Sequence, residues 1–409
     1  MARWAILTLV TLAYAAAALA ALAVAPLAPL LRDDLRLSRV QVGLLLPAVY
    51  LGGVLMSLPA GWLADRLGVR PTLALGVALT GALVALAAVS ASLPLLLLCL
   101  VGAGFGFSVG NPATGKAVVE WFPPRERGVA MGVKQTGLTL GGIAGALLLP
   151  TLAVELGWRD ALAIAGAFAA LGGLAVAALY RSPARKAGAP TAARPRLREL
   201  GVFVARRGVR VLFAGAFLLS MMQSSLLAYF ALYAKESFDV SAVAAGQLLA
   251  LAQAGGTVSR LGGGLVSDRA LGGRRRPGVV ATALVGAGAF AALALGDALP
   301  RALLWILAPV AGVGAFGWVG LYFALVAEIG GARYAGLLTG VAVACAWSGV
   351  LVGPPLFGLV VEATGGYGVA WLLLAGIAVT VAIGLARLEP LVQREPVTRA
   401  AEDGGHQAT

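Results

Sequence analysis

The sequence predicts an all-α membrane protein with twelve transmembrane helices in two six-helix halves. Apolar residues make up 60% of the 409 residues and charged residues 12%, whereas soluble domains hold about 45–50% apolar and about 25% charged residues. The apolar residues fall in runs long enough to cross a bilayer, which takes about 20 residues in a helix. In addition, sequence features of the first half of the chain recur in the second half.

Charged residues or Gly and Pro separate the apolar runs. No water inside a bilayer satisfies an open backbone, so each run is expected to form a helix. The expected spans are 5–30, 40–60, 72–92, 95–118, 129–153, 160–180, 210–234, 241–263, 278–298, 301–325, 336–361 and 367–387. The chain then divides into a first half (1–180), a basic connector (181–209), a second half (210–387) and a polar tail (388–409).

The net charge of +13 is placed in a way that favours a membrane over a nucleic-acid partner. Of the 31 Lys and Arg residues, 22 lie in segments on the side of the N-terminus and six on the other side. Positive charge collects on the cytoplasmic side of membrane proteins, so both termini are expected inside a bacterial inner membrane. The connector is expected to rest on anionic lipid head groups. A monomer satisfies this architecture.

The two halves repeat each other at a nearly constant offset. At 203 residues, Ser38, Gly43, Gly61, Asp65 and Arg66 match Ser241, Gly246, Gly264, Asp268 and Arg269. At 208 residues, Gly104, Gly106, Glu120, Gly128, Gly132, Gly141 and Gly145 match Gly312, Gly314, Glu328, Gly336, Gly340, Gly349 and Gly353. Two such halves are related by an axis along the membrane normal, with a site between them near the midplane that opens to one side at a time. This predicts a transporter.

The segment 61–70 (GWLADRLGVR) lies between the second and third spans, and a shorter copy, 264–269 (GLVSDR), lies between the eighth and ninth. The first copy resembles the loop signature of the major facilitator superfamily of secondary transporters, except that Pro71 stands at the signature's last position. The resemblance covers nearly the whole chain. It implies the fold of that superfamily and transport by alternating access, with no enzyme activity and no cofactor.

The same resemblance implies a gate at the cytoplasmic side. Its expected residues are Asp65, Arg66, Arg70 and Glu120 in the first half and Asp268, Arg269 and Glu328 in the second. Arg66 and Arg70 are expected to pair with Glu120. Glu328 is expected to form an ion pair with Arg269 or Arg274. The alternative is a solvated loop whose positive charge serves only to set the orientation of the chain in the membrane.

Ionisable residues inside spans indicate function because they are costly in lipid. No Asp or Glu lies in the middle of a predicted span, which argues against an exporter of cationic drugs. Arg260 lies eight residues before Asp268, about 12 Å inward, and Lys134 lies seven residues after Arg127, about 10 Å inward. A guanidinium pairs well with a carboxylate, so these cations predict an anionic substrate.

Two further resemblances support an anion. The stretch from Arg260 through Gly264 to Asp268 resembles the eighth span of monocarboxylate and oxalate/formate-type transporters, in which the matching arginine binds the substrate carboxylate. Gly256 stands where animal monocarboxylate transporters carry an aspartate, so the route of proton coupling is open. The segment 120–132 (EWFPPRERGVAMG) resembles a run in organic-anion symporters. A role of Arg260 in the gate network, or snorkelling to the interface, is the alternative.

Polar residues within spans are the remaining ligand candidates. Asn111 directly precedes Pro112, and its amide faces either the cavity or the kink that the proline introduces. The other candidates are Tyr14, Gln223, Tyr229, Gln253 and Tyr322, with Tyr50 and Trp318 as further aromatics. Aromatic residues near span ends are often interfacial anchors instead.

The function expected from the sequence is uptake of a small organic anion, such as a monocarboxylate. Proton symport is the expected coupling, with anion exchange as the alternative. The first rival function is efflux of a drug or metabolite, because the glycine spacing over 128–145 approximates the fifth-span motif of drug antiporters. The second rival is a membrane sensor that transports nothing.

Overall fold

The structure, a computed structural model, describes residues 2–182, 207–270, 272 and 274–387, and within these residues it contains helices and no strands. The first half consists of α1 (Ala2–Ala21), α2 (Val24–Leu35), α3 (Arg39–Leu67), α4 (Val69–Ala87), α5 (Leu93–Trp121), α6 (Arg127–Leu156) and α7 (Trp158–Leu179). The second consists of α9 (Arg207–Phe238), α10 (Ala242–Arg269), α11 (Arg275–Leu293), α12 (Leu304–Phe316), α13 (Trp318–Thr364) and α14 (Gly368–Ala386). Short 3₁₀ helices lie at Pro124–Glu126, Gly296–Ala298 and Arg301–Leu303.

Eleven segments of the described residues are long and apolar enough to cross a membrane. Helices α1 and α2 form one of them, Arg3–Leu35. Helix α13 contains the last part of the span Arg301–Ile329, whose earlier part includes α12, and the whole of the next span, Leu338–Thr364. The expected span 241–263 lies within α10, whose hydropathy is reduced by Gln247 and Gln253. Most of the predicted connector 181–209, and the whole tail 388–409, fall outside the described residues.

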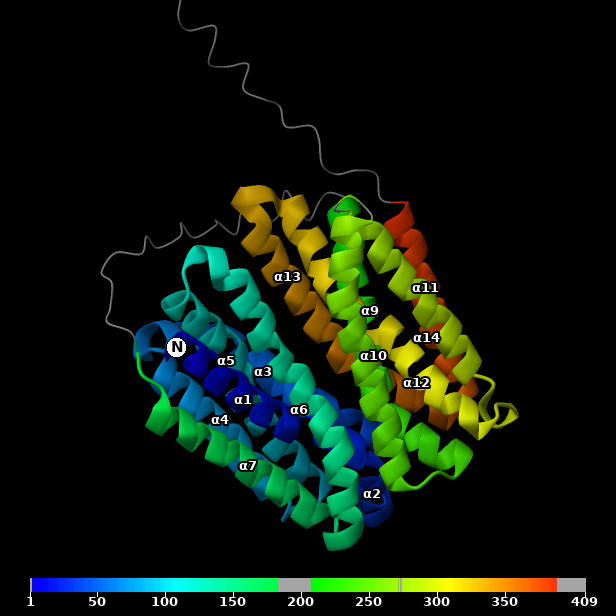
Figure 1. Ribbon diagram of the computed structural model, residues 1–409. Coiled ribbons are helices and arrows are strands. Elements are labelled where there is room, and N and C mark those ends of the chain that lie inside the picture. The colour runs from blue at the N-terminus through cyan, green and yellow to red at the C-terminus, as the bar shows by residue number, and fades with distance from the viewer. Residues whose placement is uncertain (1, 183–206, 271, 273, 388–409) are drawn as a thin grey trace, which may run out of the picture.

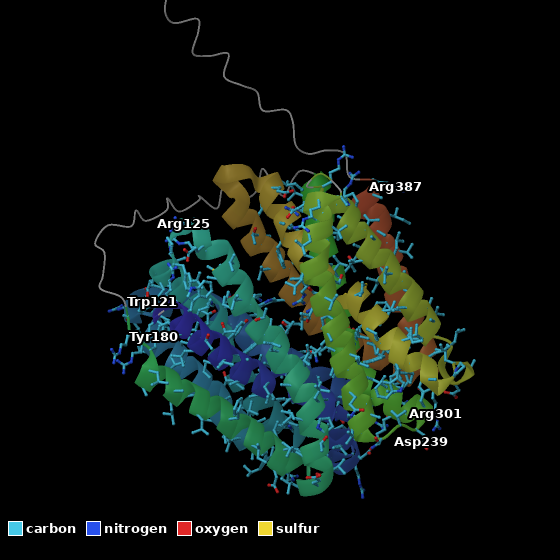
Figure 2. The ribbon with its side chains drawn as sticks, viewed as in Figure 1. Trp121, Arg125, Tyr180, Asp239, Arg301 and Arg387 are labelled. Carbon is cyan, nitrogen blue, oxygen red and sulfur yellow. The ribbon has the colours of Figure 1, made fainter. Side chains whose placement is uncertain are left out.

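The bundle has two ends, which we call the linker end and the far end. The linker end carries Arg125, Tyr180 and Arg387, and the far end carries Asp239 and Arg301 (Figure 2). Figure 1 shows the two halves in contact at the far end and spreading apart toward the linker end.

The sequence repeat is also a repeat of helix contacts. In the first half α3 packs on α5, α4 on α7 and α1 on α6. In the second half the matching helices pack in the same way, α10 on α12, α11 on α14 and α9 on α13. The halves meet through the matching contacts of α3 with α13 and of α10 with α6.

Serine caps begin the two helices that form these contacts. The Ser38 hydroxyl accepts from the Gln41 backbone N–H at 3.2 Å, and the Gln41 side chain accepts from the Ser38 N–H at 2.8 Å. In the repeat, the Ser241 hydroxyl accepts from the Ala244 N–H at 3.1 Å. Each cap satisfies a backbone donor that the helix leaves free, so matching serines fix matching starts for α3 and α10.

Glycines allow the closest helix contacts, again in matching pairs. A methyl group on Gly52 or Gly104 would overlap the carbonyl oxygen of Val101 or Val49, where α3 crosses α5. In the repeat, a methyl group on Gly255 or Gly312 would overlap the carbonyl of Pro309 or Ala252. Small residues let backbones approach where lipid provides no hydrophobic drive for association.

We expect Gly104→Ala to lower the thermal unfolding midpoint of the purified protein. The new methyl group overlaps the Val49 carbonyl, and such overpacking costs about 1–3 kcal/mol. Gly376→Ala in α14 is the matched control, because nothing lies within 4 Å of its added methyl group. Equal midpoints for the two variants would contradict the close crossing of α3 and α5.

Candidate functional site

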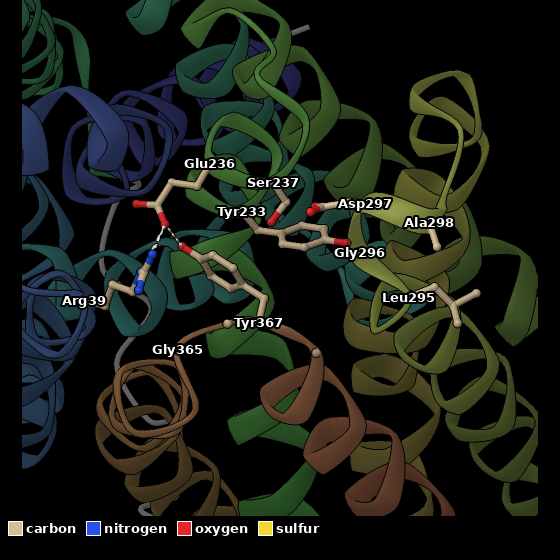
Figure 3. A pocket seen from close by; sticks show the side chains of 12 residues that line it. Arg39, Tyr233, Glu236, Ser237, Leu295, Gly296, Asp297, Ala298, Gly365 and Tyr367 are labelled. Carbon is tan, nitrogen blue, oxygen red and sulfur yellow. Dashed lines mark hydrogen bonds and ion pairs between the residues drawn. The ribbon is translucent and has the colours of Figure 1, made fainter.

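Ionic contacts between the halves close the far end. The Glu236 carboxylate at the end of α9 pairs with Arg32 of α2 at 2.6 Å and with Arg39 of α3 at 2.9 Å. The Tyr367 hydroxyl donates to the same carboxylate at 2.9 Å (Figure 3). We call Arg32, Arg39, Glu236 and Tyr367 the far latch.

Three more contacts join the halves beside the far latch. The Val40 N–H, in the first turn of α3, donates to Glu362 of α13 at 3.1 Å, where a carboxylate also meets the positive end of the helix dipole. The Tyr229 hydroxyl of α9 donates to the Arg39 carbonyl at 2.5 Å. Lys235 pairs with Asp33 at 2.5 Å. Tyr229, expected as a substrate ligand, therefore lies in the far-end closure.

The far latch borders a cavity of about 420 Å³ between the end of α9 and the loops at 295–298 and 365–368. Burial and the neighbouring Glu236 carboxylate raise the pKa of Tyr367 above its usual value. The phenol is therefore neutral, and it acts as a hydrogen-bond donor in the latch.

The space around glycines on the facing helices indicates that the linker end is open. At the far end, a methyl group on Gly43 of α3 would meet the Pro354 carbonyl at 2.7 Å, and one on Gly246 of α10 would meet Pro150 at 2.5 Å. At the linker end nothing lies within 4 Å of a methyl group added to the matching stretches of the same four helices, at Gly61, Gly128, Gly132, Gly262, Gly264 and Gly340.

Lys134 of α6 is buried near the middle of the first half, with 5% of its surface exposed. Its ammonium donates to the side-chain oxygen of Asn111 on α5 and lies 5.9 Å from the centre of the Tyr14 ring. Asn111 remains exposed although it lies well inside a spanning helix. The first half thus holds one cation, a polar amide and an aromatic ring together.

Arg260 of α10 lies in the second half, and its surroundings include residues of both halves. Its Nε donates to the Phe316 carbonyl at 2.7 Å, and its guanidinium lies within electrostatic range of the Tyr50 phenol on α3. Tyr50 also lies in electrostatic range of Tyr14, and its ring meets Trp347 of α13 edge-on, 6.2 Å between centroids. Tyr50 is therefore near both Arg260 and Tyr14, and Tyr14 lies beside Lys134.

Neither Lys134 nor Arg260 forms an ion pair with any carboxylate of the described residues. Buried charges in proteins are normally paired. We define the central site by the two cations and their neighbours Tyr14, Tyr50, Asn111 and Trp347. The charge of the central site is therefore positive.

Two other predicted ligands lie away from the central site. Tyr322 is fully buried, and its hydroxyl donates to the Leu212 carbonyl within the second half. The Gln253 side-chain NH₂ donates to the Gly142 carbonyl at 3.2 Å, which links α10 to α6 across the halves. The structure assigns no hydrogen-bond partner to the buried Gln223 oxygen on α9. Of the uncharged candidates, Tyr14 and Asn111 lie beside Lys134, and Tyr50 lies near Arg260.

In this structure, with its linker end open, Arg66 and Arg70 make contacts other than the predicted pairs with Glu120, which stay a prediction for the state closed at that end. Arg66 lies over the Trp62 ring at 5.1 Å, and the Arg70 guanidinium donates to the Ala177 carbonyl at 2.7 Å from Nε. Both arginines therefore bind within the first half.

Lys116 takes the place that was expected for the arginines. Its ammonium lies 3.1 Å from Asp65 and 2.7 Å from the Ala64 carbonyl, and within electrostatic range of Glu120. It does so because α5, which carries it, packs directly on α3.

In the second half, Arg275 replaces the expected partners of Glu328. It pairs with Asp268 at 2.6 Å and with Glu328 at 3.2 Å. Arg269 and Arg274 were the expected partners, and all three arginines lie within seven residues of each other. The sequence predicted an arginine cluster next to Glu328, but it did not identify Arg275 as the arginine that forms the ion pair.

The glycines that suggested drug efflux have structural contacts. Methyl groups on Gly137 and Gly141 would overlap the backbone of α1 at Thr11 and Ala15. One on Gly142 would overlap the Gln253 side chain. Close helix packing therefore accounts for Gly137, Gly141 and Gly142 of this spacing.

Comparisons with known proteins agree with this architecture. The family model of the Major Facilitator Superfamily matches residues 10–353. An uncharacterized MFS-type transporter of Mycobacterium tuberculosis (strain CDC 1551 / Oshkosh) is 30% identical over 334 residues, which cover 78% of this chain and 73% of that protein. The hexuronate transporter of Bacillus subtilis (strain 168) is 23% identical over 90% of this chain and 91% of its own length.

The fold is also similar to a solved structure, a bacterial homologue of the human lysosomal transporter Spinster in an inward-facing and unoccupied conformation. The TM-score is 0.77 at 20% identity, covering 94% of this chain and 95% of that one. Given the family match over most of its length, the chain belongs to the Major Facilitator Superfamily of membrane transporters.

Proposed function

We propose that the protein carries a small organic anion across a bacterial inner membrane by alternating access, and that the anion binds at the central site. The observation that carries this proposal is the buried ammonium of Lys134, 5% exposed, without a carboxylate partner among the described residues. Arg260 of the other half lacks one as well. Two unpaired cations are costly in a membrane unless an anion or water neutralises them.

The composition of the central site narrows the substrate class. The guanidinium fork suits a carboxylate, and the Asn111 amide with the Tyr14 and Tyr50 phenols suits hydroxyl groups. A hydroxylated monocarboxylate fits both requirements. The Bacillus subtilis relative named as a hexuronate transporter supports this class, because a hexuronate is a carboxylate with several hydroxyl groups.

The orientation follows from charge placement. We infer that the linker end faces the cytoplasm, because the sequence assigns 22 of the 31 Lys and Arg residues to segments on the side of the N-terminus. The state described here is then open to the cytoplasm and closed by the far latch. Proton symport stays a prediction, since no carboxylate of the described residues contacts Lys134, Asn111 or Arg260.

A thermal-shift screen against small carboxylates tests the proposal. We expect hydroxylated monocarboxylates at about 100 times their Kd to raise the melting temperature by about 2–4 °C, because ligand bound only to the folded state stabilises it. Lys134→Gln is expected to lose the shift. Lys235→Gln, whose lysine pairs with Asp33 at the far end, is expected to keep it. Stabilisation by neutral or cationic compounds alone would refute an anion site.

A further inference from the structure

The two central cations lie on helices that face each other across the halves. Lys134 belongs to α6 and Arg260 to α10, and these helices make one of the two main contacts between the halves. Lys134 is held by Asn111 and Arg260 by Phe316, so each cation is fixed by its own half. A rocking motion of the halves therefore changes the distance between them.

The far-end contacts fix the register in which α6 and α10 run past each other. The two helices are antiparallel, with Gly246 opposite Ala146 and Gln253 opposite Gly142. Counting onward toward the linker end, Lys134 comes eight residues before Gly142 and Arg260 seven residues after Gln253. At 1.5 Å per residue both lie about 11 Å from that contact, at the same depth.

We propose that the carrier closes at its linker end only when an anion lies between Lys134 and Arg260, so that it works as an exchanger of organic anions. This inference rests on the anion site proposed above and concerns its mode of coupling. The register brings the two cations opposite each other when α6 and α10 close along the stretch that is now open, where Gly132 and Gly262 have no neighbour within 4 Å.

The physical reason is repulsion between like charges. Closure of the linker end removes water from the central site, and the repulsion becomes stronger there. Two positive charges brought within several Å of each other in a medium of low dielectric repel strongly. A bound carboxylate neutralises the pair, and the loaded carrier closes. A proton does not replace the anion, because it carries the same sign of charge. The empty carrier consequently stays open to the linker end, and net flux is slower than exchange.

A distance measurement on the substrate-free protein tests this directly. Spin labels at Arg125→Cys and Ala270→Cys report the width of the linker end, after replacement of Cys99 and Cys345. We expect a single long distance for the unmodified site. Lys134→Gln is expected to add a shorter population, whereas Lys134→Arg, which keeps the charge, adds none. Arg260→Gln, in the other half, is expected to behave like Lys134→Gln and serves if that variant fails to fold.

Identical distance distributions in the neutralised variants and the unmodified protein would overturn the inference. A flux measurement separates it from the proposed function. Uptake of radiolabelled glucuronate into vesicles loaded with unlabelled glucuronate is expected to exceed uptake into empty vesicles by at least about tenfold. Equal rates would refute exchange and leave the anion site intact. No glucuronate uptake, together with no thermal stabilisation by any carboxylate, would refute the proposed function itself.

Discussion

Arg260→Ala is expected to reduce kcat/KM for carboxylate uptake in proteoliposomes by at least about 30-fold, since losing a charge-assisted contact to the substrate costs about 2–5 kcal/mol. The guanidinium is fixed by the Phe316 carbonyl through Nε, which leaves its terminal nitrogens for the substrate. Removing it leaves the carboxylate with Lys134 alone.

The conservative variant separates charge from geometry. Arg260→Lys keeps the charge but not the planar fork that binds a carboxylate at two points, so we expect an intermediate loss. Arg301→Ala, an exposed arginine at the far end, is the matched control and is expected to leave uptake unchanged. Uptake by Arg260→Ala at the level of this control would show that Arg260 serves the gate or the lipid interface.

Glu236→Gln is expected to shift the protein away from the linker-open state and to reduce uptake by about tenfold or more, since breaking a largely buried ion pair leaves its partners uncompensated. The carboxylate holds Arg32 and Arg39, which are 29% and 26% exposed. Because both arginines come from the opposite half, leaving them unpaired destabilises only the state in which the far end is closed. We take this destabilisation as about 1–3 kcal/mol, because the arginines are partly exposed.

The measurement is the distance between spin labels at Arg36→Cys and Asp239→Cys, which lie on the two halves at the far end. With the transported carboxylate present, Glu236→Gln is expected to add a longer population. Asp33→Asn is the control, because its contact with Lys235 is more than half exposed on the aspartate side, at 56%, and such pairs contribute about 0–1 kcal/mol. The same distribution in both variants would mean that the far latch does not hold the halves together.

The fold was predictable because the signals for it are local or periodic. Span length and hydropathy located the helices. The matches of Gly104 with Gly312 and of Ser38 with Ser241 indicated a repeat, and the structure gives these residues matching helix crossings and caps. Helix α10 shows the limit of hydropathy, since its glutamines reduce its apolarity. Gln253 is nevertheless accommodated, because its amide donates to Gly142 across the halves.

The site was predictable in part. Depth in the spans identified Lys134 and Arg260 as cations inside the membrane, and the structure gives each a neutral partner, Asn111 and Phe316. The far latch had no such signal. Glu236 lies at a span end, about 200 residues from Arg32 and Arg39 in sequence, and ion pairs between halves depend on how the halves dock. Only a list of charges near the expected outer ends could have pointed to it.

The most direct test of the central claim is a double-mutant cycle on binding. The ligand is the carboxylate that gives the largest thermal shift, and its Kd is measured for the unmodified protein, Lys134→Gln, Arg260→Gln and the double variant. If both cations contact one anion, each single variant loses at least about tenfold in affinity and the double variant loses less than the two losses combined. Binding to the double variant with unchanged Kd would contradict an anion held between the two halves.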